Sequence, residues 1–253
     1  MVPNRRESDQ YAESPMAHGT SDPIEFHTHV TQHFDSLYQT SPAFRERFEV
    51  WSRLIDRYSR PEQTVLDVGC GTGVFSFYAA QRNGRVIGVD GSSGMIEQCR
   101  QKHAGLGGGN LEFIEANITT SPEKWIAPVE LVLCSSVLEY LPDFDASLEI
   151  LRGLVNEGGV LIVSLPCFAS YYRKLERIAY SLTGRPMFYR YLKCRVGDAE
   201  VKEKLAQHGF ELLERHYYAR PRIVPRWVGR ILPARRYYML FVDVARKRPR
   251  SAS

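Results

Sequence analysis

The sequence predicts an α/β fold built on a doubly wound, mostly parallel sheet of seven strands. Five short apolar runs alternate with helical patterns between residues 64 and 165, which is typical of crossover units on a parallel sheet. Two further strand-like runs follow after an insertion and close the sheet. The 253 residues, of which 43% are hydrophobic and 25% charged, suit one large domain with a substantial core.

Two helices are expected before the first strand. Within residues 23–60, apolar side chains recur at helical spacing, beginning with Phe34, Leu37 and Tyr38. Pro42 indicates the start of the second helix, because proline is favoured at the first helical position. We expect this pair to form a cap on the domain.

The alternating region supplies the remaining elements. The expected strands are short apolar runs over residues 64–68, 85–90, 111–117, 130–134 and 160–165. The helices expected among them cover residues 74–83, 93–102 and 146–155, the last closed by Gly158 and Gly159. The closing elements are helices over 169–182 and 201–208 and strands over 210–217 and 238–245.

These patterns predict a simple domain organisation. Residues 1–22 are polar and are expected to be a disordered leader, and residues 247–253 a basic tail. Residues 23–246 are expected to form a single domain with an insertion at 168–195 after strand five. No apolar run approaches the roughly 18–20 residues that span a bilayer, and we expect a cytoplasmic protein.

Cysteine content and charge limit the function classes. The five cysteines are scattered and form no CxxC pair, which favours a reducing compartment without disulfides or a zinc site. The charge is asymmetric: residues 1–167 carry a net −9 and residues 168–253 a net +13. Such a basic region indicates contact with nucleic acid, a membrane or an anionic substrate, or else a solvated basic surface.

The clearest motif is the run DVGCGTG at residues 67–73, where the first expected strand ends. Glycines let the backbone turn sharply and approach a ligand closely, and the following helix N-terminus donates N–H groups. The spacing is GxGxG, whereas dinucleotide enzymes use GxGxxG to seat a pyrophosphate. Asp67 before the loop suits a ligand ammonium group. Asp90, at the end of the second strand, is placed to accept hydrogen bonds from both hydroxyls of a ribose.

Over residues 30–165 these features resemble class I methyltransferases that use S-adenosyl-L-methionine (SAM), which have a Rossmann-like sheet. The resemblance implies that SAM is the cofactor, with its methionine part on the glycine loop and its ribose on Asp90. Tyr38 is the expected lid residue near the sulfonium. Asn117 stands where the family commonly has an acid that accepts from the adenine amino group. The implied cofactor-binding residues are Tyr38, Asp67, Gly69, Cys70, Gly71, Gly73, Asp90, Gly91, Ser92, Met95, Asn117, Ile118 and Ser135.

The segment after strand four narrows the kind of methyltransferase. It reads SSVLEY at residues 135–140, which differs from the Asn/Asp-Pro-Pro-aromatic turn of nucleic-acid amino-methyltransferases. It also lacks the second glutamate of protein-arginine methyltransferases. The N-terminal helices are similar to those of small-molecule enzymes acting on quinone precursors and magnesium protoporphyrin. Quinone O-methyltransferases often read EVLEH here, and because two of those three metal ligands are missing, we expect no catalytic metal.

Proton removal from the acceptor has three candidate residues, namely Glu139, Tyr140 and His33. The alternative is that these residues have structural roles, in which Glu139 caps a helix and Tyr140 packs against neighbouring side chains. His29 and His33 are four residues apart, but without carboxylate or cysteine partners nearby they are expected to be solvated lid residues or a proton acceptor rather than a metal site.

The basic insert at residues 218–236 alternates apolar residues with arginines. We consider three roles for it, in this order: a pocket wall for an anionic or aromatic acceptor, an interfacial segment on anionic lipid, and a nucleic-acid surface. The leading hypothesis is a methyltransferase that transfers the methyl group to an oxygen of an aromatic, anionic or lipid-like small molecule. An RNA-modifying enzyme and a non-catalytic SAM-binding module are the alternatives.

Overall fold

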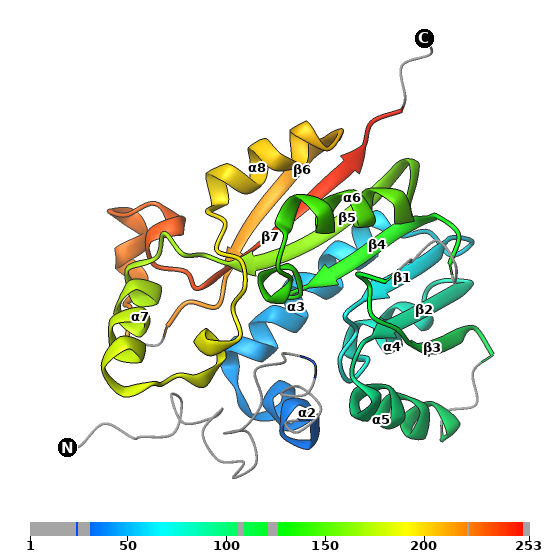
Figure 1. Cartoon of the computed structure of the whole chain (residues 1–253), viewed down its shortest axis with the longest axis horizontal. Coiled ribbons are helices and arrows are strands. Elements are labelled where there is room, and N and C mark those ends of the chain that lie inside the picture. Colours follow the sequence, from blue (N-terminus) through cyan, green and yellow to red (C-terminus); the bar gives the residue numbers. More distant parts are fainter. Residues whose placement is uncertain (1–23, 25–30, 106–108, 121–125, 222, 250–253) are drawn as a thin grey trace.

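A computed structural model of the chain describes residues 24, 31–105, 109–120, 126–221 and 223–249 (Figure 1). The side chains of residues 31–35 and of Arg226 lie outside this description. The expected disordered leader at residues 1–22, together with His27 and His29, also lies outside the described residues.

Within the described residues seven strands form one sheet, which confirms the predicted doubly wound fold. The strands are β1 (Thr64–Val68), β2 (Arg85–Asp90), β3 (Leu111–Glu115), β4 (Val129–Ser135), β5 (Val155–Pro166), β6 (Phe210–Tyr218) and β7 (Leu240–Lys247). Their spatial order is β3-β2-β1-β4-β5-β7-β6. The first five strands are parallel, whereas β7 pairs antiparallel with both β5 and β6. The last two strands therefore close the sheet as a hairpin-like pair.

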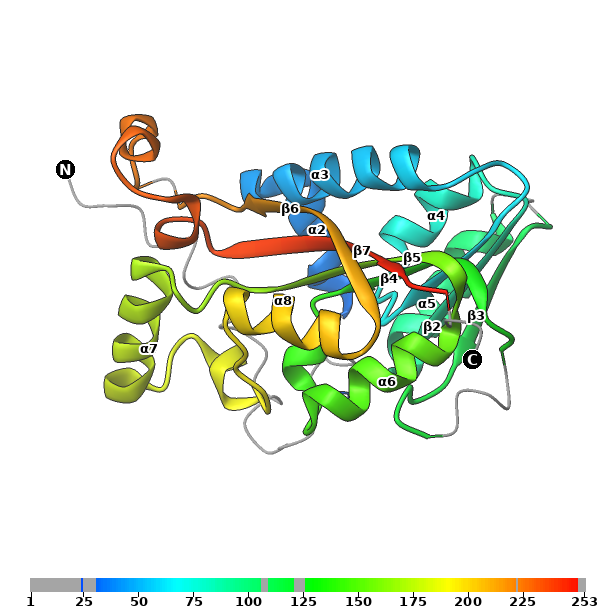
Figure 2. The same ribbon diagram turned by 90° about the horizontal axis from the view of Figure 1, so that it is seen from above.

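Helices cover both faces of the sheet (Figure 2). The α-helices are α2 (Thr31–Thr40), α3 (Pro42–Tyr58), α4 (Val74–Ala80), α5 (Ser93–Ala104), α6 (Phe144–Leu154), α7 (Tyr171–Thr183) and α8 (Asp198–Gln207). Short 3₁₀ helices are η2 (Leu138–Tyr140), η3 (Met187–Arg190), η4 (Arg226–Arg230) and η5 (Ala234–Arg236). Helix α3 begins as predicted, with Ser41 at its N-cap and proline following.

Each face of the sheet carries its own apolar core. Trp51 of α3, Phe75 of α4 and Cys99 of α5 pack with the strands on one face. Leu148 of α6 and Leu205 of α8 belong to the core on the other face. In both cases an apolar stripe of the helix is buried against the sheet, which is the arrangement that hydrophobic burial favours. The sheet thereby becomes a rigid platform for the residues at its strand ends.

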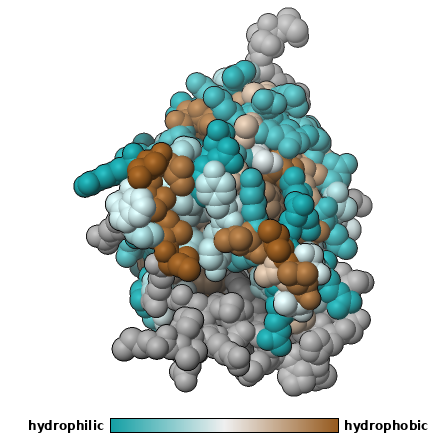
Figure 3. Space-filling view, turned by 90° about the vertical axis from the view of Figure 1, so that its left-hand side faces the viewer, coloured by the Kyte–Doolittle hydropathy of each residue, from teal (hydrophilic) through white to brown (hydrophobic). Residues whose placement is uncertain are grey.

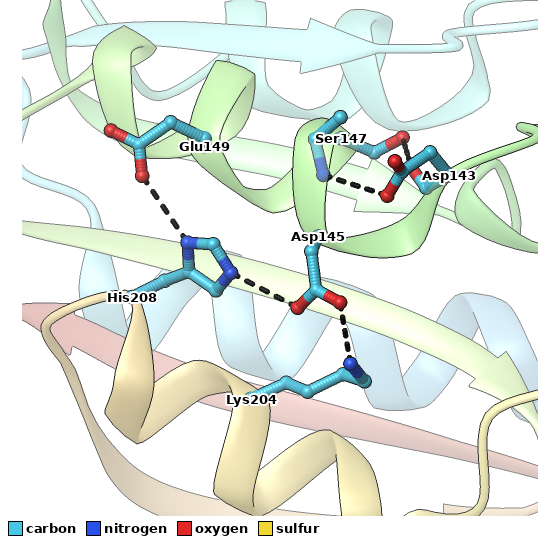
Figure 4. A network of polar contacts seen from close by, with 7 residues as sticks. Asp143, Asp145, Ser147, Glu149, Lys204 and His208 are labelled. Atoms are coloured by element: carbon cyan, nitrogen blue, oxygen red, sulfur yellow. Dashed lines mark hydrogen bonds and ion pairs between the residues drawn. The ribbon is translucent and has the colours of Figure 1, made fainter.

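A polar network joins α6 to α8 at the surface (Figure 4). The two ring nitrogens of His208 lie 3.1 Å from Asp145 Oδ1 and 3.2 Å from Glu149 Oε2. Lys204 donates to the other carboxylate oxygen of Asp145. Hydrogen bonds from Lys204 and His208 lower the pKa of Asp145, and the bond from His208 lowers the pKa of Glu149. The network holds the two helices together on the face away from α3.

Some predicted boundaries need correction. The fifth strand begins at Val155, directly after α6, so that Gly158 and Gly159 lie inside the strand rather than at a helix end. The pairing with β4 shifts register at this point, which is why glycine is tolerated there. Strand β7 continues to Lys247, one residue into the expected tail, and the Lys247 amine donates to the Val155 carbonyl oxygen at 2.7 Å.

Candidate active site

A large cavity lies where β1 and β4 end. These neighbouring strands are the switch point of the sheet, because β2 and β3 lie on one side of β1 and the later strands on the other. Ligands of doubly wound sheets bind at the carboxyl ends of the strands at such a point. The cavity has a volume of about 1750 Å³. Ligand sites commonly measure roughly 300–1,000 Å³, so this one has room for a cofactor and an acceptor together.

The glycine loop forms one wall of the cavity. Gly69, Gly71 and Gly73 adopt positive φ angles of 67°, 53° and 79°, a region that other residues enter only with strain. The amides of Gly69 and Cys70 donate to the Val89 carbonyl oxygen at 2.7 and 3.0 Å, which fixes the loop to β2. The alternating glycines are therefore required by the backbone itself.

Gly71 and Asp90 form a cradle that fits a nucleoside. A Cβ added at Gly71 would meet no atom within 4 Å, so the backbone is open toward the cavity. Asp90 Oδ2 accepts a hydrogen bond from the Gly71 amide at 2.9 Å, and Oδ1 accepts one from the Ser92 amide at 2.8 Å. These bonds orient the carboxylate, and each oxygen keeps a lone pair for a further donor. Burial raises the pKa of Asp90, while the two backbone amides oppose that rise.

Asp67 is buried beside the glycine loop and is not among the residues that line the cavity. Its carboxylate is 1% exposed and accepts a hydrogen bond from the Ser76 hydroxyl at 2.6 Å. Burial raises its pKa to about 6. In this position Asp67 accepts from the first turn of α4, and its direct contact with a ligand ammonium group stays a prediction. Gly73 and Ser92 also lie behind the cavity surface, as the N-caps of α4 and α5.

The other residues implied for cofactor binding line the cavity. They are Tyr38, Gly69, Cys70, Gly71, Asp90, Gly91, Met95, Asn117, Ile118 and Ser135. The contacts of Asn117 bear on its expected role as an acceptor, which stays a prediction. Its side-chain oxygen already accepts from the Thr119 amide at 3.0 Å and the Thr119 hydroxyl at 2.8 Å. Within the described contacts, its amide nitrogen is the group left to meet a ligand.

Glu139 is the most unusual titratable group in the cavity. It belongs to η2, directly after β4, and is 2% exposed. Burial raises the pKa of its carboxyl to about 7, although the positive charges of Arg47 and Arg173 oppose that rise. Its Oε2 atom has no hydrogen-bond partner among the described residues. A buried carboxylate oxygen without a partner, at the wall of a cavity, is suited to take a proton from a ligand.

The segment after β5 lies against this glutamate. The amides of Lys193 and Cys194 donate to the Glu139 carbonyl oxygen at 2.9 and 3.2 Å. Tyr191 is fully buried and packs against Tyr140, so that Tyr140 is held between the cavity wall and this segment. The expected insertion at residues 168–195 thus reaches the candidate site.

Cations and aromatic rings line the part of the cavity formed by residues 166–240, which we call its outer half. Residues there include Arg173, Arg185, Lys193 and Arg220 together with Tyr172, Phe188, Tyr237 and Tyr238. No described side chain forms a hydrogen bond or ion pair with the Lys193 amine. The Arg220 guanidinium lies close enough to Glu46 for its charge to oppose the rise that burial causes in the pKa of that carboxyl. Of these two cations, Lys193 is therefore the more open to an anionic ligand.

The N-terminal helices close the cavity from the other side. Tyr38 lines it and packs edge-on against Phe44 and Phe75, with ring centroids 5.1 and 6.3 Å away. Arg47 of α3 donates to the Ser135 hydroxyl at 2.6 Å. His33 is on α2, but its side chain lies outside the described part.

Sequence reasoning missed several residues of the site. Arg47, Arg173, Lys193 and Arg220 belong to no motif and come from segments far from the glycine loop. For Arg173, Lys193 and Arg220 the available signal was the positive charge of residues 168–253, whereas no signal in the sequence pointed to Arg47.

Comparison with known proteins defines the class. Residues 59–209 match a family model described as a methyltransferase domain, which is more than half of the chain. The protein therefore belongs to the methyltransferase domain family, and the predicted class I SAM-dependent methyltransferase is confirmed.

Individual relatives agree with this class. A trans-aconitate 2-methyltransferase from Rhodopseudomonas palustris is 38% identical over 106 residues, which are 40% of this chain and 38% of that protein. A ubiquinone biosynthesis O-methyltransferase from Erwinia tasmaniensis is 29% identical over 100 residues, or 40% and 41% of the two chains. The match thus spans about two fifths of each curated relative. Magnesium protoporphyrin IX methyltransferase from Synechocystis, solved with S-adenosylhomocysteine bound, has the same fold. Its TM-score is 0.58 at 18% identity, over 94% of this chain and 91% of that one.

Proposed function

We propose that the protein transfers a methyl group from SAM to an oxygen of a small acceptor that carries negative charge next to an aromatic or apolar body. The observation that carries this proposal is Glu139, a residue of the cavity lining whose buried Oε2 atom has no partner among the described residues and whose pKa burial raises to about 7. A group with that pKa can accept a proton at neutral pH, which methylation of a hydroxyl or phenol requires.

The cofactor is expected in the inner half of the cavity, between the glycine loop and Asp90. The open backbone of Gly71 gives close approach, and the oriented carboxylate of Asp90 accepts from the ribose hydroxyls. Asn117 is expected to donate from its amide to a ring nitrogen of the adenine, because its oxygen is held by Thr119. When bound, SAM supplies an electrophilic methyl group on a sulfonium.

Glu139 is proposed as the residue that takes the acceptor proton at Oε2. The ionised carboxylate is stabilised by the nearby positive charges of Arg47 and Arg173, which keeps its pKa within reach of neutral pH. The protein contributes alignment as well, since holding the acceptor oxygen in line with the methyl group accounts for much of the rate in such displacements. Tyr140 has its position fixed by Tyr191 and is expected to shape the acceptor site.

The chemistry of the acceptor follows from the outer half of the cavity. Lys193 and Arg220 favour an anionic group, and the rings of Phe188, Tyr237 and Tyr238 favour a flat or apolar body. The names of the relatives fit this pattern: trans-aconitate is an anion, and ubiquinone biosynthesis handles an aromatic ring.

A carboxylate acceptor is a second candidate, favoured by the same Lys193 and Arg220. A carboxylate is already ionised at neutral pH and needs no base, so Glu139 would then contribute little to the rate. Replacement of Glu139 by glutamine separates the two acceptor classes.

The direct test uses SAM labelled in its methyl group, incubated with the protein and a cell extract. The products are separated into small molecules, RNA and protein. We expect the label in the small-molecule fraction, and its absence there would contradict the proposal. Label in RNA would instead assign the basic segments to an RNA substrate, and SAM binding without any transfer would indicate a binding module.

A further inference from the structure

Exposed apolar side chains of the described residues are concentrated at one end of the molecule. Four of them lie on α7, where Tyr171, Leu175, Ile178 and Leu182 are 49%, 64%, 57% and 80% exposed. Their spacing places them along one side of the helix. No residue of α7 is buried. A helix with an apolar stripe normally buries it, so this stripe lacks its partner.

The remaining exposed apolar residues lie next to this helix. Ile223, Trp227 and Ile231 are 80%, 59% and 69% exposed. A small groove of about 270 Å³ is lined by both segments, with Tyr171 on one side and Val228 on the other, which makes the surface continuous. Figures 1 and 2 place α7 and the segment with η4 at the same end, and Figure 3 shows hydrophobic side chains gathered there. We call α7 and residues 223–231 the exposed apolar face.

Positive charge surrounds this face. Residues 168–195 and 218–236 contain thirteen lysine and arginine residues but a single acidic residue, Glu176. The Glu176 carboxylate is paired with Arg173 at 2.7 Å. Lys174, Arg177 and Arg230 are exposed beside the apolar side chains. The face therefore combines apolar groups with a net positive field.

We propose that the exposed apolar face docks the protein on the surface of an anionic lipid bilayer. Apolar side chains would enter the boundary between headgroups and acyl chains, Trp227 would lie at the interface, and the cations would contact acidic headgroups. None of the helices in the described ranges is long and apolar enough to cross a bilayer.

Two other occupants fit the face less well. A symmetric dimer through this face would bring Lys174 and Arg177 of one copy close to the same cations of the other, which is repulsive. RNA is bound through cations and aromatic stacking, whereas five of the seven exposed apolar residues are aliphatic. Aliphatic side chains surrounded by cations are suited to a lipid surface, where acyl chains lie next to anionic headgroups.

The position of the face also bears on the acceptor. Leu175, Ala179 and Ile223 line the large cavity as well as this surface, so the cavity opens where the bilayer would lie. An acceptor with a lipid-like tail would reach the site directly from the membrane. This consequence rests on the proposed function, whereas membrane binding itself does not.

The test measures binding of the full chain to vesicles, without any methyl-transfer assay. Sedimentation with phosphatidylcholine vesicles is compared with vesicles containing phosphatidylglycerol, at low and at high salt. We expect binding to the anionic vesicles only, weakened by salt. In a Trp125→Phe background, Trp227 should shift its fluorescence to shorter wavelength on binding, and adding Trp227→Phe should abolish the shift, since the remaining Trp51 is already fully buried.

Two variants locate the contact. Ile178→Ser with Leu182→Ser removes apolar groups, and Lys174→Gln with Arg177→Gln removes charge; each pair is expected to weaken binding roughly tenfold or more. Arg53→Gln with Lys202→Gln is the matched control, because it removes the same charge from exposed positions on α3 and α8. Melting temperatures should stay unchanged in all three, since none of these side chains is buried.

Three results would overturn the proposal. One is the absence of vesicle binding at low salt. The second is equal weakening by the control pair, which would mean that overall charge and not this face is responsible. The third is that the wild type binds RNA, or self-associates in light scattering, but does not bind vesicles, and that the Ile178→Ser and Leu182→Ser pair removes this other interaction.

Discussion

Arg47 of α3 donates to the Ser135 hydroxyl at 2.6 Å and to the Ser135 carbonyl oxygen at 3.2 Å. This contact joins the N-terminal cap to the end of β4 across 88 residues of sequence. It also holds the guanidinium close enough to Glu139 for its positive charge to affect that carboxyl. The cap helix therefore contributes to the electrostatics of the candidate site as well as covering it.

Arg47→Met is expected to raise the pH at which the protein becomes active. Burial raises the pKa of Glu139 and the charge of Arg47 opposes that rise, so loss of the charge lets the pKa rise further. The apparent pKa of the methyl-transfer rate should move upward in a pH profile. Arg53→Met, on the exposed side of the same helix, is the control and should leave the profile in place. An unchanged pH profile for Arg47→Met would mean that the charge of Arg47 does not affect the pKa of Glu139.

Asp90→Ala is expected to weaken SAM binding by roughly tenfold to a hundredfold, because hydrogen bonds to a charged acceptor contribute about 1.5–3 kcal/mol each. Isothermal titration calorimetry measures the affinity. Glu112→Ala removes an exposed carboxylate from the neighbouring strand and should bind SAM normally. Because the Gly71 and Ser92 amides also lose their acceptor, the melting temperature should fall modestly. Unchanged SAM affinity in Asp90→Ala would contradict the cofactor placement.

Gly69→Ala and Gly71→Ala should fail in different ways. A Cβ at Gly69 would lie 2.2 Å from Val137 Cγ2, so this change should destabilise the fold by about 1–3 kcal/mol from the clash, in addition to the positive φ. At Gly71 the space is open and the cost is the positive φ alone, about 1 kcal/mol, but the methyl group would enter the cavity. Thermal unfolding should therefore detect the first variant, and SAM titration the second. Equal stability of the Gly69→Ala and Gly71→Ala variants would contradict the close contact between Gly69 and Val137.

Glu139→Gln should stabilise the protein at alkaline pH. The folded pKa of about 7 lies above the ordinary value of 4.5, so the neutral carboxyl is favoured in the folded state. That preference is fully present below pH 4.5 and is lost as the pH rises through 7, where ionisation of the buried group opposes folding. Glutamine never ionises, and at about pH 8 its advantage should reach roughly 3 kcal/mol in chemical unfolding. If Glu139→Gln were no more stable than the wild type at that pH, ionisation of Glu139 would not destabilise the folded protein.

The sheet could be predicted because its signals are local. Alternating apolar runs and the glycine spacing at residues 67–73 depend on neighbours in sequence, and they located the strands and the loop. The role of Asp67 could not be read in this way, because whether a carboxylate faces the cavity or Ser76 depends on how the loop folds back. Arg47 and Lys193 reach the site through contacts between distant segments, which no single motif encodes.

The central claim is that Glu139 serves methyl transfer to a small molecule. The most direct test follows transfer of labelled methyl groups into the small-molecule fraction, for the wild type and Glu139→Gln, between about pH 5 and pH 9. We predict that the wild-type rate rises with pH through about 7. The variant rate should be lower than the wild-type rate by a factor of roughly a hundred or more, and it should not depend on pH in that range. SAM affinity should be equal in the two. A variant that transfers methyl groups to the same product as fast as the wild type would contradict the claim.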